Sequence, residues 1–202
     1  MSGEAAAAGG GRDPRLAQYL ALLERWNATY NLTAVRDPIQ MHRQHLADCL
    51  SVVEPLRREV SARPVRILDV GSGGGLPGVV LALSEPTWDV TCIDAVGKKA
   101  AFIRQVAAEL RLANLHAVYG RVQNLRETGF DVITARAFGS LGDLVEWTKP
   151  LLAPRGVWMA MKGRWPDSEL SALPGGVVFH VEPLRVPELD AERCLVWMRK
   201  DE

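Results

Sequence analysis

Residues 67–78, Ile-Leu-Asp-Val-Gly-Ser-Gly-Gly-Gly-Leu-Pro-Gly, decide the fold of this chain. The apolar start predicts a buried strand. The glycines that follow predict a tight turn in which the backbone approaches a ligand, because glycine accepts positive φ angles and has no side chain to block the approach. Pro77 suits the start of a helix, whose unpaired N–H groups can hold a carboxylate or phosphate. The stretch therefore predicts a strand–loop–helix unit for a nucleotide-like cofactor.

Two cofactors are compatible with this loop. Gly73, Gly75 and Gly78 fit Gly-x-Gly-x-x-Gly, which alone is a weak indication of a dinucleotide site. Asp69, two residues before Gly71, instead gives the acidic frame usual for S-adenosylmethionine. A tight turn without a ligand is a third interpretation, and five glycines in eight residues count against it.

Asp94 ends the next apolar stretch, near the offset of about 20 residues at which a carboxylate binds ribose hydroxyls. The alternative is that Asp94 only caps the helix that begins around residues 96–98. No arginine follows Asp94 directly, which disfavours NADP.

Alternating apolar runs and helical periodicities predict the remaining elements. The expected helices cover residues 14–30, with Asp13 as N-cap, then a segment from Asp37-Pro38 to near Pro55, and residues 77–84, 100–110 and 141–149. The expected strands are 65–70, 90–93, 115–119, 130–135, 156–161, 177–181 and 194–198. Nearly continuous apolar strands between helices indicate a parallel sheet covered on both faces.

The last two strands have no helical pattern between them, which predicts an antiparallel finish. This finish favours the α/β fold of a class I S-adenosylmethionine-dependent methyltransferase: Rossmann-like, with an N-terminal helical extension. We expect a disordered tail over residues 1–12, the helical extension over 13–62 and the Rossmann-like domain over 63–202, in one compact unit.

The composition of the chain indicates in which cellular compartment it works and which partners it can bind. No apolar run approaches the roughly 18 residues of a membrane span, and the amino terminus lacks the pattern of a secretory signal. Cys49, Cys92 and Cys194 are widely spaced, which predicts buried thiols in a reducing cytoplasm. The 24 basic and 24 acidic residues cancel, so a nucleic-acid partner would have to be held by a local patch.

Several separate motifs resemble one family over about residues 26–197. They are Trp26-Asn27, Asn31-Leu32-Thr33, His45-Leu-Ala-Asp48, residues 69–78, Asp94, Gly120-Arg121-Val122, Thr134-Ala135-Arg136-Ala137-Phe138 and Met161-Lys162-Gly163. With these motifs the chain resembles the GidB (glucose-inhibited division protein B, RsmG) family, which methylates N7 of a guanine in bacterial 16S ribosomal RNA. The resemblance implies S-adenosylmethionine as cofactor, S-adenosylhomocysteine as product, and the small ribosomal subunit or its RNA as cytoplasmic partner.

The resemblance also assigns residues. It implies that Gly71 and Leu76 contact the cofactor, with Gly73 giving the close approach, and that Val122 and Gln123 hold the adenine. Gln123 stands where the family generally has Glu, and Cys49 replaces the common Ser after Asp48. Gln123 leaves the adenine contact in place but changes any part of it that depends on charge, and Cys49 is a small change.

The implied reaction needs little acid–base chemistry. N7 of guanine has a lone pair and no proton, so the enzyme mainly has to position donor and acceptor. We therefore expect no catalytic base and no metal. The sequence has neither an Asn-Pro-Pro-Tyr motif nor a Pro-Cys nucleophile. No base-stacking aromatic is evident on the substrate side.

Arg136 is expected at the end of a strand, beside the ligand crevice. Its guanidinium could bind an RNA phosphate or the cofactor carboxylate bidentately, or form a structural salt bridge. The resemblance places Arg136 at the methyl-transfer site. Lys162 ends the following strand and is a weaker candidate for the substrate.

His42, His45 and Asp48 lie at helical spacing and could suggest metal ligands. The reaction needs no metal, and the resemblance instead implies that His45 and Asp48 close the crevice. Arg36, His42, Arg43 and His45 could also form a small basic cluster for RNA or a solvated helix face.

Three other functions remain open: methylation of another acceptor, a nicotinamide-dependent oxidoreductase, and a non-catalytic cofactor sensor. Nothing in the sequence requires an oligomer, so a monomer is expected.

Overall fold

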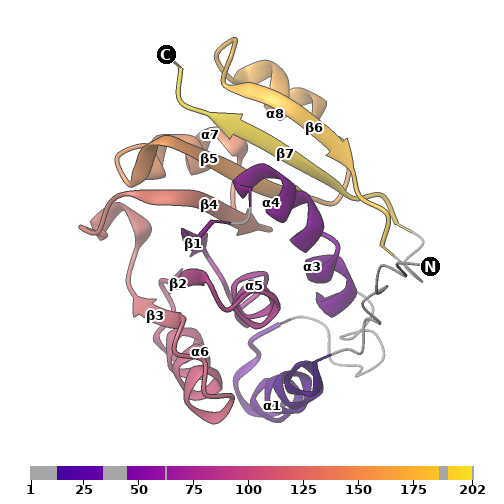
Figure 1. Ribbon diagram of the computed structural model, residues 1–202, viewed down its shortest axis with the longest axis vertical. Helices are drawn as coiled ribbons and strands as arrows, with labels where there is room; N and C mark the ends of the chain where they lie inside the picture. Colours follow the sequence, from indigo (N-terminus) through magenta and orange to yellow (C-terminus); the bar gives the residue numbers. More distant parts are fainter. Residues whose placement is uncertain (1–12, 34–44, 62, 187–190, 202) are drawn as a thin grey trace, which may run out of the picture.

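The computed structural model describes residues 13–33, 45–61, 63–186 and 191–201. In these parts of the chain, seven strands form one sheet with the order β3-β2-β1-β4-β5-β7-β6 (Figure 1). The strands are β1 (Val65–Val70), β2 (Trp88–Asp94), β3 (Leu115–Tyr119), β4 (Phe130–Arg136), β5 (Leu152–Lys162), β6 (Val178–Pro183) and β7 (Cys194–Arg199). All neighbours are parallel except β7, which is antiparallel to both β5 and β6. The predicted α/β class with an antiparallel finish is confirmed.

The helices follow the strands in alternation. They are α1 (Pro14–Tyr30), α3 (Asp48–Leu50), α4 (Val53–Val60), α5 (Gly78–Ser84), α6 (Gly97–Glu109), the 3₁₀ helix η2 (Val122–Asn124), α7 (Leu141–Thr148) and α8 (Asp167–Ala172). As predicted, Asp13 caps α1, and its carboxylate accepts from the Arg15 amide at 2.9 Å. Among the described residues, no helix is long and apolar enough to cross a membrane.

The sheet has an apolar core on each face. Successive strand residues point to opposite faces, so Ile67 joins one core and Leu68 the other. The first core contains side chains of α1, α4, α5 and α6, and the second contains side chains of α7. In Figure 1, α4 crosses in front of the sheet. The helices that precede β1 thus share a core with the sheet. The boundary at residue 63 between the helical extension and the Rossmann-like domain stays a prediction.

Two expectations about the helices were wrong. The second helix was expected to end near Pro55, but Pro55 is the third residue of α4 and the helix continues to Val60. Proline is accepted there because amides in the first helical turn have no intrahelical acceptor. Helix α8 was not predicted, because none of its side chains is buried and it has no apolar stripe. The Asp37-Pro38 start and the tail over residues 1–12 lie outside the described residues.

The direction of the strands gathers the candidate residues on one edge. The carboxyl ends of β1, β2, β4 and β5 open on this edge. Lys162, the last residue of β5, pairs with Cys194, the first residue of β7, and Cys194 pairs with Pro183 at the end of β6. Chain segments from β1 to β7 therefore border the same edge. The three cysteines are buried thiols, as predicted.

Candidate active site

The glycine loop joins β1 to α5 and is held from two sides. Gly71 and Gly73 have φ angles of +66° and +57°, which favour glycine. From the sheet, the carbonyl of Ile93 accepts from the Gly71 amide at 2.9 Å. From the N-terminal helices, the Tyr19 hydroxyl of α1 donates to the Gly74 carbonyl at 2.6 Å. Helix α1 thus fixes the loop from the side opposite the sheet.

Asp69 lies beneath this loop and lines neither of the cavities described below. Its Oδ2 accepts from the Gly78 amide at 2.9 Å, at the start of α5. A Cβ atom on Gly78 would lie 2.3 Å from Cys92 Sγ, so only glycine lets α5 pack this closely on the strands. Burial raises the pKa of Asp69 to about 7, against the hydrogen bond from Gly78. Asp69 and Gly78 therefore shape the loop from within the core.

One cavity, of about 300 Å³, lies beyond the ends of β1, β2 and β3. Gly71, Asp94, Val122, Gln123 and Phe138 are among its lining residues. Oδ2 of Asp94 accepts from the Gly73 amide at 3.0 Å, and Oδ1 accepts from the Val96 amide at 2.8 Å. Asp94 therefore holds the loop and the turn into α6 while its carboxylate borders the cavity.

A second cavity, of about 510 Å³, adjoins the first, and Gly71 borders both. The predicted residues in its lining are Gly71, Gly73, Leu76, His45, Asp48, Arg136 and Lys162. Each of the ten predicted site residues therefore lines one of these two adjoining cavities, which we call the crevice. Arg36, His42 and Arg43 of the suggested basic cluster lie outside the described residues.

Arg136 is the centre of a polar network in the crevice. Its Nη1 donates to Nδ1 of His45 at 3.2 Å and to Oδ2 of Asp48 at 3.5 Å. Nε2 of His45 lies 2.6 Å from the Thr33 hydroxyl. Because a guanidinium can only donate, His45 Nδ1 is the acceptor and Nε2 carries the proton, so the ring is neutral. The N-terminal segment thus holds Arg136 from two sides.

Lys162 is anchored by the helix that the sequence did not predict. Its ammonium contacts both carboxylate oxygens of Glu169 in α8, at 2.8 and 2.9 Å. Oε2 of Glu169 also accepts from the Leu141 amide at the start of α7, at 2.7 Å. Glu169 therefore ties the end of β5 to α7 and fixes where the Lys162 charge lies.

Sequence reasoning missed two cations of the crevice. Arg193 donates from Nε to Oδ1 of Asp48 at 3.1 Å, and Lys99 lies 3.6 Å from Oδ2 of Asp94. Neither residue belongs to a motif that the sequence marks out. Only the antiparallel direction of β7 brings Arg193 to this edge, and only the position of α6 brings Lys99 to Asp94.

A family model described as rRNA small subunit methyltransferase G matches residues 12–196. Ribosomal RNA small subunit methyltransferase G of Leptothrix cholodnii is 61% identical over 185 residues, which cover 91% of this chain and 85% of that protein. The protein of the same name from Methylibium petroleiphilum is 58% identical over 187 residues, with coverage of 92% and 85%.

Solved structures share the fold. A methyltransferase from Geobacter sulfurreducens matches with a TM-score of 0.60 at 17% identity, covering 94% of this chain and 90% of its own. A SAM-dependent methyltransferase from Aquifex aeolicus matches with a TM-score of 0.57 at 15% identity, covering 80% and 97%. The order of strands and the antiparallel β7 thus belong to a fold that methyltransferases use.

Proposed function

The chain belongs to the GidB family of rRNA small subunit methyltransferases G, and we propose that it transfers a methyl group from S-adenosylmethionine to N7 of a guanine in 16S ribosomal RNA. The observation that carries the proposal is the convergence of all ten predicted site residues on one crevice at the carboxyl edge of the sheet. Ligands of open α/β folds bind at this edge.

The smaller cavity fits an adenosine. Val122, Gln123 and Asp94 all line it. A carboxylate accepts hydrogen bonds from ribose hydroxyls, while a side-chain amide such as that of Gln123 both donates and accepts, as pairing with adenine requires. We propose that Val122 and Gln123 hold the adenine and Asp94 the ribose.

The glycine loop fits the amino-acid part of the cofactor. Gly73 lines the larger cavity, and a Cβ atom added to it would meet only the carbonyl oxygens of Gly71 and Leu32, at 3.9 and 4.0 Å, so its backbone is not crowded. Gly71 connects the two cavities, and Leu76 gives the larger one an apolar surface. When bound, S-adenosylmethionine supplies an electrophilic methyl group on its sulfonium. We propose that Gly71, Gly73 and Leu76 position it.

The larger cavity has room for the acceptor beside Arg136. The side chain of Arg136 is 21% exposed and lines this cavity. His45 and Asp48 fix its orientation, and Lys162 adds a second cation. We propose that Arg136 binds an RNA phosphate or the cofactor carboxylate, and that Lys162 contacts the RNA.

In this proposal, the crevice residues act by positioning the methyl donor and the guanine. Guanine N7 attacks with its own lone pair, so no side chain has to remove a proton. The neutral His45 is occupied by Arg136 and Thr33, which suits a supporting role.

Deleting the gene in its host tests the proposal. Small-subunit RNA from the deletion strain should lack one N7-methylguanine that the parent strain contains, and a plasmid copy of the gene should restore it. An unchanged set of modified nucleosides in 16S RNA would refute the ribosomal substrate.

A further inference from the structure

A third cavity, of about 310 Å³, lies on the same edge of the sheet as the crevice. Its lining residues are Trp165, Pro183, Leu184, Glu192, Arg193 and Cys194. Arg193 lines both this cavity and the larger cavity of the crevice. The two cavities therefore share one lining residue, Arg193. The volume falls at the lower end of the range of about 300–1,000 Å³ that is typical of ligand pockets.

Hydrogen bonds fix the walls of this cavity. Beyond the paired strands β6 and β7, the Leu184 amide donates to the Arg193 carbonyl at 2.8 Å. On the other wall, the Cys194 thiol donates to the Arg164 carbonyl at 3.5 Å, which ties the segment between β5 and α8 to β7. Trp165 stands on that segment, so its backbone is held in place next to the cavity.

Trp165 is exposed to solvent although its side chain is large and apolar. Its side chain is 48% exposed, although tryptophan is one of the largest apolar side chains. Four other large apolar side chains of the described residues are similarly exposed: Tyr30, Val96, Tyr119 and Phe179. Among these five, Trp165 is the one that lines a cavity sharing a lining residue, Arg193, with the crevice. An indole with a free face at this place can stack on a planar group.

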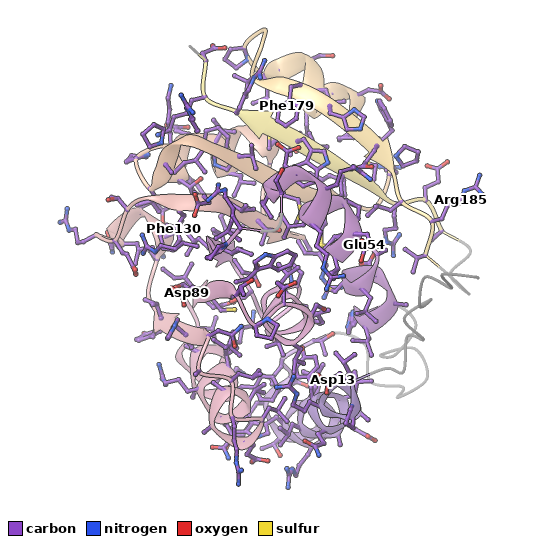
Figure 2. The ribbon with its side chains drawn as sticks, viewed as in Figure 1. Asp13, Glu54, Asp89, Phe130, Phe179 and Arg185 are labelled. Carbon is purple, nitrogen blue, oxygen red and sulfur yellow. The ribbon has the colours of Figure 1, made fainter. Side chains whose placement is uncertain are left out.

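One arginine lines the cavity with Trp165, and two others adjoin its lining residues in the sequence. Arg193 and its chain neighbour Glu192 both line the cavity, and Nε of Arg193 is paired with Oδ1 of Asp48 at 3.1 Å. Arg164 and Arg185 are exposed and have no ion-pair partner among the residues that the structure describes. Figure 2 shows Arg185 just beyond the end of β6. Arg164 precedes Trp165 and Arg185 follows Leu184 in the chain, so each of these two cations adjoins a lining residue and can attract the phosphates of a polyanion.

We propose that this cavity, the Trp165 subsite, receives the base of a nucleotide next to the methylated guanine. The base stacks on the Trp165 indole and its phosphate lies against Arg193. Proteins commonly recognise unpaired RNA in this way, by stacking bases on aromatic side chains beside cations. The inference rests on the proposed function and extends it to an aromatic that the sequence did not reveal. The alternative occupant of the Trp165 subsite, which the second test distinguishes, is a side chain of a ribosomal protein.

The first test separates stacking from simple packing with two substitutions. Trp165→Leu keeps an apolar side chain without a ring, whereas Trp165→Phe keeps a ring that can stack. Phe179→Leu is the matched control, because Phe179 is an exposed aromatic of the outer strand β6 that lines none of the three cavities (Figure 2). Methyl transfer from labelled S-adenosylmethionine is measured on small subunits and on protein-free 16S RNA.

Loss of one stacked base should raise the KM for the RNA substrate roughly 5- to 100-fold in Trp165→Leu. The affinity for S-adenosylhomocysteine should stay at the wild-type value, and Trp165→Phe and Phe179→Leu should resemble the wild type. Equal KM values in Trp165→Leu and the wild type would overturn the subsite. Equal losses in the Leu and Phe variants would also overturn it, because they would indicate packing.

The second test identifies the occupant without depending on turnover. Trp165 is replaced by the photoreactive amino acid p-benzoylphenylalanine, and the variant is irradiated on small subunits that lack the modification. Cross-links to nucleotides flanking the methylated guanine support the proposal. Cross-links only to ribosomal protein, or none above the level of the same replacement at Phe179, overturn it. If the wild type transfers no methyl group to 16S RNA, the proposed function itself fails, which is a different result.

Discussion

The hydroxyl of Tyr19 donates to the carbonyl of Gly74 at 2.6 Å, although 55 positions separate the two residues in the sequence. Both groups are buried, so the bond has no competition from water. Through this bond, the first helix of the chain takes part in shaping the loop that we propose for the cofactor. The N-terminal helices are therefore part of the site and not only a cover.

Tyr19→Phe should weaken both the fold and the loop. The substitution leaves the buried Gly74 carbonyl without its donor, which should cost about 1–3 kcal/mol in the free energy of unfolding. The affinity for S-adenosylhomocysteine should fall as well. Urea denaturation and calorimetric titration measure the two effects. Tyr30→Phe is the control on the same helix, because Tyr30 is 42% exposed. Identical values for the two variants would contradict a role for the bond.

Gly78→Ala should destabilise the protein through a collision in the core. The new Cβ atom would lie 2.3 Å from Cys92 Sγ and 2.8 Å from Asp69 Oδ2, so the strand and α5 must move apart. Overpacking of this kind costs about 1–3 kcal/mol. Gly175→Ala is the matched control, since no atom lies within 4 Å of its added Cβ. Thermal unfolding compares the two variants, and equal midpoints would show that the packing at Gly78 is looser than described.

Asp69 should make stability fall as the pH rises from about 4 to 7. Burial raises its pKa in the folded state from 3.8 to about 7, so in this window the unfolded chain releases a proton that the folded chain keeps. Above pH 7 both states are ionised and the effect levels off. Asp69→Asn removes the titration. The difference in unfolding free energy, wild type minus variant, should therefore decline across the window, and a flat or rising difference would contradict the buried carboxyl.

Arg136→Lys should reduce methyl transfer while the fold persists. A lysine has a single charged point and cannot reproduce the forked donors that His45 and Asp48 orient. Removal of one oriented donor typically costs about 100-fold or more in rate. Arg155→Lys is the control, because Arg155 is exposed and lies outside the three cavities.

The binding constants of the Arg136→Lys variant also show whether Arg136 binds the cofactor carboxylate or an RNA phosphate. Weaker binding of S-adenosylhomocysteine would indicate the cofactor carboxylate, and a higher KM for RNA at unchanged cofactor affinity would indicate a phosphate. Full activity of the variant would refute the placement of Arg136 at the methyl-transfer site.

The sheet could be predicted from the sequence because its central strands β1 and β4 are apolar on both faces, and the edge strand β3 still forms a short apolar run. Residues 65–70 and 115–119 were predicted as strands with the observed bounds of β1 and β3. The order of the elements then placed Asp94, Val122 and Arg136 at strand ends or just after them, where parallel strands converge. The family resemblance supplied the roles of Val122 and Arg136, and the spacing after the glycine loop supplied that of Asp94; these roles stay predictions.

The remainder of the site depends on contacts between distant segments. Glu169 anchors Lys162 from α8, a short helix whose lack of buried side chains hides it from periodicity. Arg193 reaches Asp48 across 145 positions, only because β7 runs against its neighbours. Trp165 lies in a connecting segment without any pattern. Sequence patterns within one segment cannot locate such residues, because their positions depend on how distant segments pair in the folded sheet.

The measurement that tests the account most directly is methyl transfer by the purified chain to 16S RNA or small subunits from a strain that lacks the gene. After incubation with labelled S-adenosylmethionine, the RNA is digested and its nucleosides are separated. The account predicts label in N7-methylguanosine at a single position, with roughly 100-fold less in Arg136→Lys. Label in another nucleoside, or none in RNA, would contradict it.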